Sequence, residues 1–236
     1  MKLVPDSTGR FAKRPHYTPA ELDVECERLV SSFLRERHGS AAYPITTDDL
    51  TVLIEKEAKD LDLFADLSEF GSGVEGVTIF DPGAKPIVKI NRELSEAPSR
   101  KNRLRTTLTH EFGHVHFHAY LFDDKLRTLD LYKSHQGKKD IVQVCKRETM
   151  LDARQTDWME WQAGHVCGAI LMPASAVRRF VKDTVASLGD SALPTLEQHV
   201  VAAVMRHFEV SEDAARVRLS RVGLLGGGQT TQGLFK

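Results

Sequence analysis

The chain has 236 residues, of which 41% are apolar and 28% charged, so it can bury a core, and its net charge of −1 gives no general attraction to nucleic acid or membranes. No apolar run approaches the roughly 20 residues of a membrane-spanning helix, and the first residues lack the apolar stretch of a signal peptide. Because the three cysteines are too few and too widely spaced for a disulfide framework, we expect a cytoplasmic protein with reduced thiols.

The N-terminal part predicts an irregular arm followed by two helices. Residues 1–17 mix proline, glycine and basic residues without periodicity. Thr18 and Glu21 form a capping-box pattern at the start of a helix, which Gly39 should end. A second, short helix is expected from Thr47, with its apolar side chains turned inward.

Strands are predicted next. Residues 61–68, 75–80 and 86–91 are short runs of apolar and β-branched residues, and the turn sequence DPGAK joins the last two. We expect a small sheet of about three strands that contains an antiparallel hairpin. The polar, proline-containing segment 92–102 should be a loop that leads into a helix carrying the sequence TLTHEFGHVHFH.

The C-terminal half is predicted to be mostly helical. Residues 119–156 are charged and poorly patterned, and we expect an insertion there. A helix should run from about residue 157 to 172, and more helices should follow from about residue 174. The sequence thus predicts one mostly helical α+β domain over residues 18–225, with a glycine-rich, flexible tail at 226–236.

The sequence His110-Glu111-Phe112-Gly113-His114 matches the pattern HExxH. On a helix, positions four apart share a face, so His110 and His114 can both direct a ring nitrogen at one ion. Glu111 lies beside that ion, where it can act as a general base towards a water activated by Zn²⁺. The spacing therefore predicts a zinc site, and the alternative is a helix that is rich in histidine by chance.

A zinc site needs a third protein ligand. The longer pattern HExxHxxGxxH does not supply it, because Phe117 and Tyr120 stand where glycine and histidine are required. His118 continues the spacing, but three ligands on successive turns of one straight helix diverge. We therefore interpret His118 as a neighbour of the ligands and His116, on another face, as structural.

A second helix can bring a carboxylate to the ion. Glu160, Gly164 and Cys167 lie on one stripe of the helix predicted from residue 157, and Gly164 would let two helices approach closely. Spacing alone leaves two alternatives open for Glu160, a metal ligand or a solvated glutamate near a helix N-terminus. Cys167 could compete as a ligand or simply fill space.

Two segments, LRTTLTHEFGHVHFH and EWQAGHVCGAILMP, resemble the ImmA/IrrE family of metallopeptidases. The likeness implies a zincin-like fold that binds one Zn²⁺ through His110, His114 and Glu160, with Glu111 as the general base. It also implies a protein substrate, such as a helix-turn-helix repressor or an antitoxin, and hence a role in gene regulation. Gly164 departs from the family pattern, which often has asparagine or aspartate at that position.

Several features stay open at this stage. His118, His165 and Tyr120 could stabilise an oxyanion by residue type alone, and His118, His165 and Cys167 could support the ligands. The main rival is a DNA- or protein-binding regulatory module whose metal site does not turn over. The segment VSEDAARVRLSRVG resembles half of a helix-turn-helix, but the near-neutral charge makes direct nucleic-acid binding a weak expectation.

Overall fold

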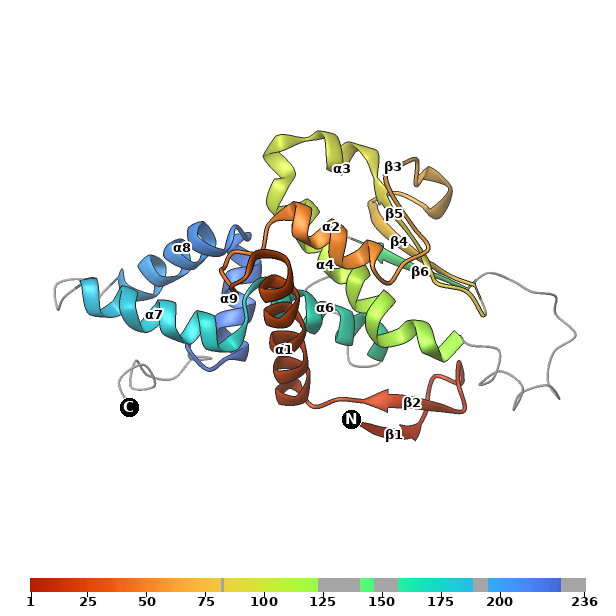
Figure 1. Cartoon of the computed structure of the whole chain (residues 1–236), viewed down its shortest axis with the longest axis horizontal. Helices are drawn as coiled ribbons and strands as arrows, with labels where there is room; N and C mark the ends of the chain where they lie inside the picture. The colour runs from red at the N-terminus through yellow and green to blue at the C-terminus, as the bar shows by residue number, and fades with distance from the viewer. Residues whose placement is uncertain (82, 123–140, 147–156, 189–194, 226–236) are drawn as a thin grey trace, which may run out of the picture. The chain divides into compact units, whose positions relative to one another are not determined.

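The computed structural model describes residues 1–81, 83–122, 141–146, 157–188 and 195–225 (Figure 1). Helices dominate, accompanied by one two-stranded and one four-stranded sheet, which confirms the predicted α+β class. The predicted tail at 226–236 and most of the predicted insertion at 119–156 lie outside the described residues. Among the described helices, none combines the length and the apolar character needed to cross a bilayer.

The described chain groups into two compact units. The first comprises Met1–Leu22 and Thr47–Cys167, and the second comprises Asp23–Thr46 and Gly168–Lys236. Two of the three boundaries therefore fall inside helices, α1 (Pro19–His38) and α6 (Trp158–Leu171). A single domain over residues 18–225 stays a prediction.

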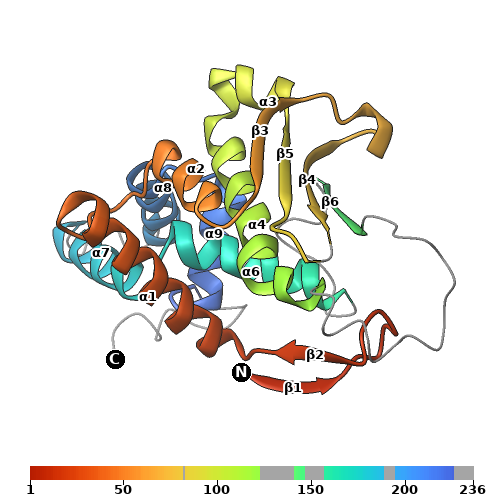
Figure 2. The ribbon, with the colours of Figure 1, turned by 45° about the vertical axis from the view of Figure 1, so that its right-hand side comes forward.

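The first unit contains the larger sheet, in the order β3-β5-β4-β6 (Figure 2). Its strands are β3 (Asp60–Ala65), β4 (Val74–Phe80), β5 (Ile87–Asn91) and β6 (Ile141–Lys146). The predicted antiparallel hairpin is confirmed as β4 and β5, with Thr78 opposite Val88. Strand β3 runs parallel to β5, and β6 runs antiparallel to β4. The sheet thus has one strand more than expected, because β6 forms within the predicted insertion.

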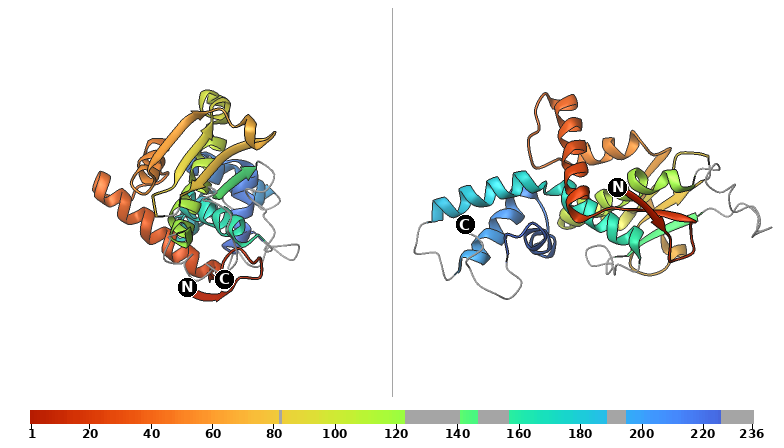
Figure 3. Two further views of the ribbon diagram at one scale, coloured as in Figure 1. Left: turned by 90° about the vertical axis from the view of Figure 1, so that its right-hand side faces the viewer. Right: turned by 90° about the horizontal axis from the view of Figure 1, so that it is seen from below.

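The prediction of an irregular N-terminal arm is wrong. Residues 1–17 contain an antiparallel pair, β1 (Lys2–Pro5) and β2 (Lys13–His16). Figure 3 shows the ribbon of this hairpin and of α6. Two hydrogen bonds hold the hairpin to the start of α6: the Trp158 indole N–H donates to Asp6 Oδ1 at 3.2 Å, and the Gln162 amide donates to the Pro15 carbonyl at 3.0 Å. Each strand has only four residues, and the helix side chains that hold the hairpin are distant in sequence, so local periodicity gave no sign of the strands.

The helix with the HExxH pattern is α4 (Lys101–His118), and two shorter helices of the first unit precede it in the chain. Helix α2 (Thr47–Glu55) confirms the predicted short helix. The predicted loop at 92–102 is partly wrong, since it contains helix α3 (Arg92–Glu96), a 3-10 turn (Pro98–Arg100) and the start of α4. Helix α3 forms because the Asn91 side chain caps it, accepting from the Glu93 backbone N–H at 2.8 Å.

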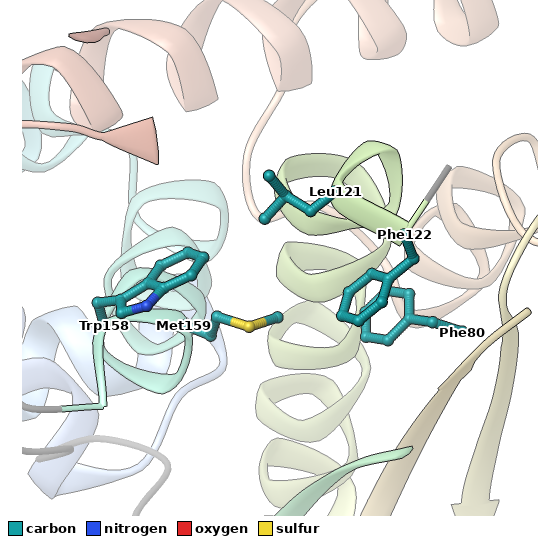
Figure 4. Close-up of a cluster of buried hydrophobic side chains, with 5 residues drawn as sticks. All are labelled: Phe80, Leu121, Phe122, Trp158 and Met159. Atoms are coloured by element: carbon teal, nitrogen blue, oxygen red, sulfur yellow. The ribbon is translucent and has the colours of Figure 1, made fainter. Parts of the chain in front are cut away.

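An apolar cluster joins the sheet to the C-terminal end of α4 and the start of α6 (Figure 4). Phe80 of β4 stacks on Phe122, which follows α4 in the turn Ala119–Phe122, with ring centroids 4.1 Å apart. The buried side chains of Leu121, Trp158 and Met159 complete the cluster. The three elements that meet at this cluster also carry the residues of the candidate site.

The second unit is helical. It contains most of α1, the end of α6, and the helices α7 (Ala174–Leu188), α8 (Leu196–Phe208) and α9 (Glu212–Arg221). Helix α1 begins at the predicted capping box: the Glu21 N–H donates to Thr18 Oγ1 at 3.2 Å, and the Thr18 N–H donates to Glu21 Oε2 at 2.8 Å. The fully buried Arg218 of α9 donates to the Met172 carbonyl and pairs with Asp23, and these contacts fix the C-terminal end of α6.

Candidate metal centre

Helix α4 carries a buried polar sequence. His110, Glu111 and His114 are fully buried, and so are the apolar side chains of Leu108 and Phe112 that anchor the helix. The threonines that precede the motif are also buried, and their hydroxyls donate to carbonyls one turn earlier, for example Thr109 Oγ1 to the Arg105 carbonyl at 2.7 Å. A helix with this composition can therefore lie in the core without leaving those hydroxyls unsatisfied.

Helix α6 approaches α4 closely at Gly113. A Cβ added to Gly113 would lie 3.0 Å from the Ala163 Cα and 3.3 Å from its Cβ. This spacing brings Glu160, one turn earlier on α6, to the histidines of α4. Gly164 was expected to allow a close approach of the two helices, whereas this contact is made by Gly113, inside the HExxH sequence.

The side chains of His110, His114 and Glu160 converge on one point. His110 Nε2 lies 3.1 Å from Glu160 Oε2, His114 Nε2 lies 3.1 Å from Glu160 Oε1, and the two Nε2 atoms are 3.2 Å apart. With metal–donor bonds of about 2.0–2.1 Å, two donors at a tetrahedral zinc ion lie about 3.3 Å apart. The residue types and the spacing of their donor atoms therefore fit Zn²⁺.

The electrostatics of the cluster suit a cation. Burial would raise the pKa of Glu160, but the charge of His114 and the hydrogen bonds from both histidines outweigh it, so that pKa is held well below its usual value. Burial likewise opposes protonation of His114, but Glu160 raises the pKa of that imidazole. A proton and a metal ion use the same nitrogen lone pair, so the carboxylate that favours the proton also favours the ion.

Glu111 projects from α4 towards strand β4. Its Oε2 accepts a hydrogen bond from Thr78 Oγ1 at 2.5 Å, while its Oε1 has no hydrogen-bond partner among the described residues. The carboxylate lies directly over Gly76, where an added Cβ would be only 2.4 Å from Oε1. Burial raises the pKa of Glu111 more than the charges of His114 and His110 and the bond from Thr78 lower it.

The structure places the remaining predicted residues in different surroundings. His118 lies next to a ligand, with its Nδ1 3.1 Å from the Nδ1 of His114, and burial together with the charge of His114 keeps the pKa of His118 well below its usual value. The Cys167 thiol donates to the Thr106 carbonyl at 3.4 Å. His165 lies beside the Trp161 ring. The side chain of Tyr120 is exposed at 42%, and partial burial raises its pKa to about 12.

Sequence reasoning missed the residues that hold Glu111 and support His114. Gly76 and Thr78 are two apart on β4 and so face the same side of the sheet, towards α4. A glycine inside a predicted strand was the available signal, because it often marks a close approach by another group. Gln162, whose amide oxygen lies 3.1 Å from His118 Nε2, gave no such signal.

Cys145 of β6 is a further buried group near this face of the sheet. It pairs with Gly76 across the β4–β6 ladder. Burial, and after it the negative charges of Glu111 and Glu160, raise the pKa of its thiol well above the usual value. The thiol therefore stays protonated at neutral pH.

Comparison with known proteins agrees with this geometry. A family model described as Peptidase_M78, the IrrE N-terminal-like domain, matches residues 57–220, which include the sheet, α4 and α6. No curated protein matches the chain closely enough to add a relative. The match covers more than half of the chain and contains all of the converging side chains. The chain therefore belongs to the M78 peptidase family, that of the IrrE N-terminal-like domain, and its first unit holds a metallopeptidase-like site.

Proposed function

We propose that the protein is a zinc-dependent endopeptidase that cleaves a specific regulatory protein. The observation that carries the proposal is the convergence of His110, His114 and Glu160 within hydrogen-bonding distance of one another, in a buried site next to Glu111. Membership of a peptidase family supports the same reaction class.

In this proposal, His110, His114 and Glu160 hold one zinc ion. When bound, zinc lowers the pKa of a coordinated water to roughly 7 and polarises the carbonyl of the scissile bond. Glu111 takes the proton of the attacking water and later passes it to the leaving amine. Because Thr78 engages Oε2, the other oxygen of Glu111 is left to accept that proton. The raised pKa of Glu111 makes it a stronger base than an exposed glutamate.

The proposed substrate is a helix-turn-helix repressor or an antitoxin, and the support for it is the likeness to the ImmA/IrrE family. An extended substrate segment could pair with an edge of the four-stranded sheet. Strand β4, which carries Gly76 and Thr78, is paired on both sides, so the edge next to it is formed by β6. Docking at such an edge would make cleavage depend on the substrate's fold as well as on its sequence, and general protease activity would then be weak.

The alternative is a DNA- or protein-binding regulatory module whose metal site does not turn over. For DNA binding, α9 would have to present free basic side chains. Two of its arginines are already paired, Arg216 with Glu197 and Glu212, and the buried Arg218 with Asp23. These ion pairs leave α9 poorly suited to bind phosphates, so they favour the peptidase proposal over a DNA-binding module.

The test combines metal analysis with cleavage. Wild-type protein should bind one zinc ion per chain, and Glu160→Ala should lose most of it. The zinc-loaded wild type should cleave the repressor encoded next to its gene, whereas Glu111→Gln should keep zinc and lose cleavage by about 10²–10⁴-fold, the usual contribution of a general base. If Glu111→Gln binds zinc and cleaves as the wild type does, the mechanism is wrong. If wild type binds zinc but cuts neither repressor nor antitoxin, the alternative is favoured.

A further inference from the structure

We infer that a buried hydrogen-bond chain, which starts at the N-terminal hairpin, sets the tautomer of His114 and directs its Nε2 lone pair at the metal. The chain passes from the Pro15 carbonyl through Gln162 and His118 to His114. The inference rests on the proposed metal site and makes Gln162 and His118 positioning residues.

The contacts form an unbroken series. Gln162 Nε2 lies 3.0 Å from the Pro15 carbonyl oxygen, and Gln162 Oε1 lies 3.1 Å from His118 Nε2. His118 Nδ1 in turn lies 3.1 Å from His114 Nδ1. All four residues are buried, so water does not compete freely for these groups.

The direction of each hydrogen bond follows from the first member. A proline carbonyl can only accept, so the amide nitrogen of Gln162 must face it, and the amide oxygen is then left to face His118. His118 must donate from Nε2 to that oxygen. A neutral imidazole has one N–H, so Nδ1 of His118 is an acceptor, and His114 must donate to it from its own Nδ1. With its proton on Nδ1, a neutral His114 has its lone pair on Nε2, the atom that lies 3.1 Å from Glu160 Oε1 and that would bind the ion.

The ring of His118 is held in place by its neighbours. The Trp158 ring lies edge-on to it, with centroids 5.5 Å apart and an interplanar angle of 89°. The indole N–H of Trp158 donates to Asp6, which lies in the same hairpin as Pro15. The hairpin is therefore connected to His118, and through it to the metal centre, by two sets of contacts: one set passes through Gln162 and the other through Trp158.

The partner on the other nitrogen of a metal-binding histidine commonly changes metal affinity or activity by about 10–100-fold. We therefore expect His118→Leu to weaken zinc binding by about that factor. His118→Asn, of similar size, can place its carbonyl oxygen near the position of Nδ1 and should recover most of the loss. His116→Asn is the matched control, because His116 lies on the same helix but bonds to Glu57, and its zinc affinity should equal that of the wild type.

The experiment uses the zinc-loaded full chain and two readouts that do not need cleavage. Long-range ¹H–¹⁵N NMR should show His114 protonated only at Nδ1 and His118 only at Nε2, with His118 assigned by the loss of its signals in His118→Asn. Competition with a chromophoric chelator should give the zinc affinities of the variants. Gln162→Met, which removes both amide contacts, serves as a second variant if His118→Leu does not fold.

The outcomes separate the two proposals. A His118 ring protonated at Nδ1, or equal zinc affinity for wild type, His118→Leu and Gln162→Met, would overturn the role of the chain. A zinc-loaded protein with the expected tautomers that cleaves neither repressor nor antitoxin would overturn the peptidase proposal and leave the hydrogen-bond chain intact.

Discussion

The substitution Gly76→Ala should separate catalysis from metal binding. Gly76 lies on β4 directly beneath the Glu111 carboxylate, and the atoms nearest to a Cβ added there belong to Glu111 and Thr107 and not to the three metal-site side chains. An added Cβ would meet Glu111 Oε1 at 2.4 Å and Thr107 Cγ2 at 2.9 Å. Both atoms belong to α4, and the carboxylate is the group with the greater freedom to move.

The size of the effect follows from the distance. Ordinary van der Waals contact begins at 3.4 Å, so 2.4 Å leaves the carboxylate 1.0 Å too close (3.4 minus 2.4). A misplacement of about 1 Å in a reacting group can cost about 10²-fold in rate. Overpacking of this kind also lowers the free energy of unfolding, by about 1–3 kcal/mol. We expect Gly76→Ala to fold, to bind zinc with wild-type affinity and to cleave about 100-fold more slowly.

The assay measures kcat for repressor cleavage together with zinc content and thermal unfolding. Gly168→Ala is the control, because its Cβ would meet Arg218 Cδ at 3.6 Å, an ordinary contact, and alanine is the better helix former. It should match the wild type in cleavage. The reasoning is refuted if Gly76→Ala, folded and zinc-loaded, cleaves at the wild-type rate.

Three other predictions concern the supports of the site and of the second unit. Gly113→Ala should push α4 and α6 apart and weaken zinc binding, which chelator competition would measure. Overpacking should lower the free energy of unfolding by about 1–3 kcal/mol, and the helix preference of alanine should partly offset this loss. Thr78→Val should keep zinc but lower kcat by about 10–100-fold, because a hydrogen bond to the charged Glu111 is worth about 1.5–3 kcal/mol. Arg218→Met should lower the free energy of unfolding by about 3–5 kcal/mol in denaturant titrations, because it removes the bonds of this buried guanidinium to Asp23 and to the Met172 carbonyl. An unchanged midpoint would contradict the role of these bonds.

The sequence was most informative where the chemistry is local. The spacing of His110 and His114 predicts a shared helix face without any knowledge of tertiary structure, and the capping box at Thr18 predicts the start of α1 in the same way. The helices of the second unit were equally clear because their apolar residues repeat at helical spacing. In each case the interacting residues lie within one or two turns of each other.

Features that depend on distant contacts were missed or left open. Spacing could not decide the role of Glu160, because its approach to the histidines depends on the contact between Gly113 and Ala163. The strands of the N-terminal hairpin and β6 are too short for alternation along the chain to reveal them, and β6 also has its partner, β4, far away in sequence. The support that Thr78 gives to Glu111 depends on how the sheet packs against α4, which no local pattern encodes.

The two faces of α4 have different roles, and a glycine allows the close contact on each: Gly113 of α4 itself on one face and Gly76 of β4 on the other. At Gly113 the helix meets α6, and this contact sets the distance between the histidines and Glu160, whereas at Gly76 the sheet meets Glu111 and sets the position of the base. If these contacts are independent, their effects should add, as they do for sites without shared partners. The double variant Gly76→Ala/Gly113→Ala should then bind zinc as Gly113→Ala does, and its kcat should fall by the product of the two single effects. A zinc affinity below that of Gly113→Ala would show that the sheet also helps to hold the ligands through α4.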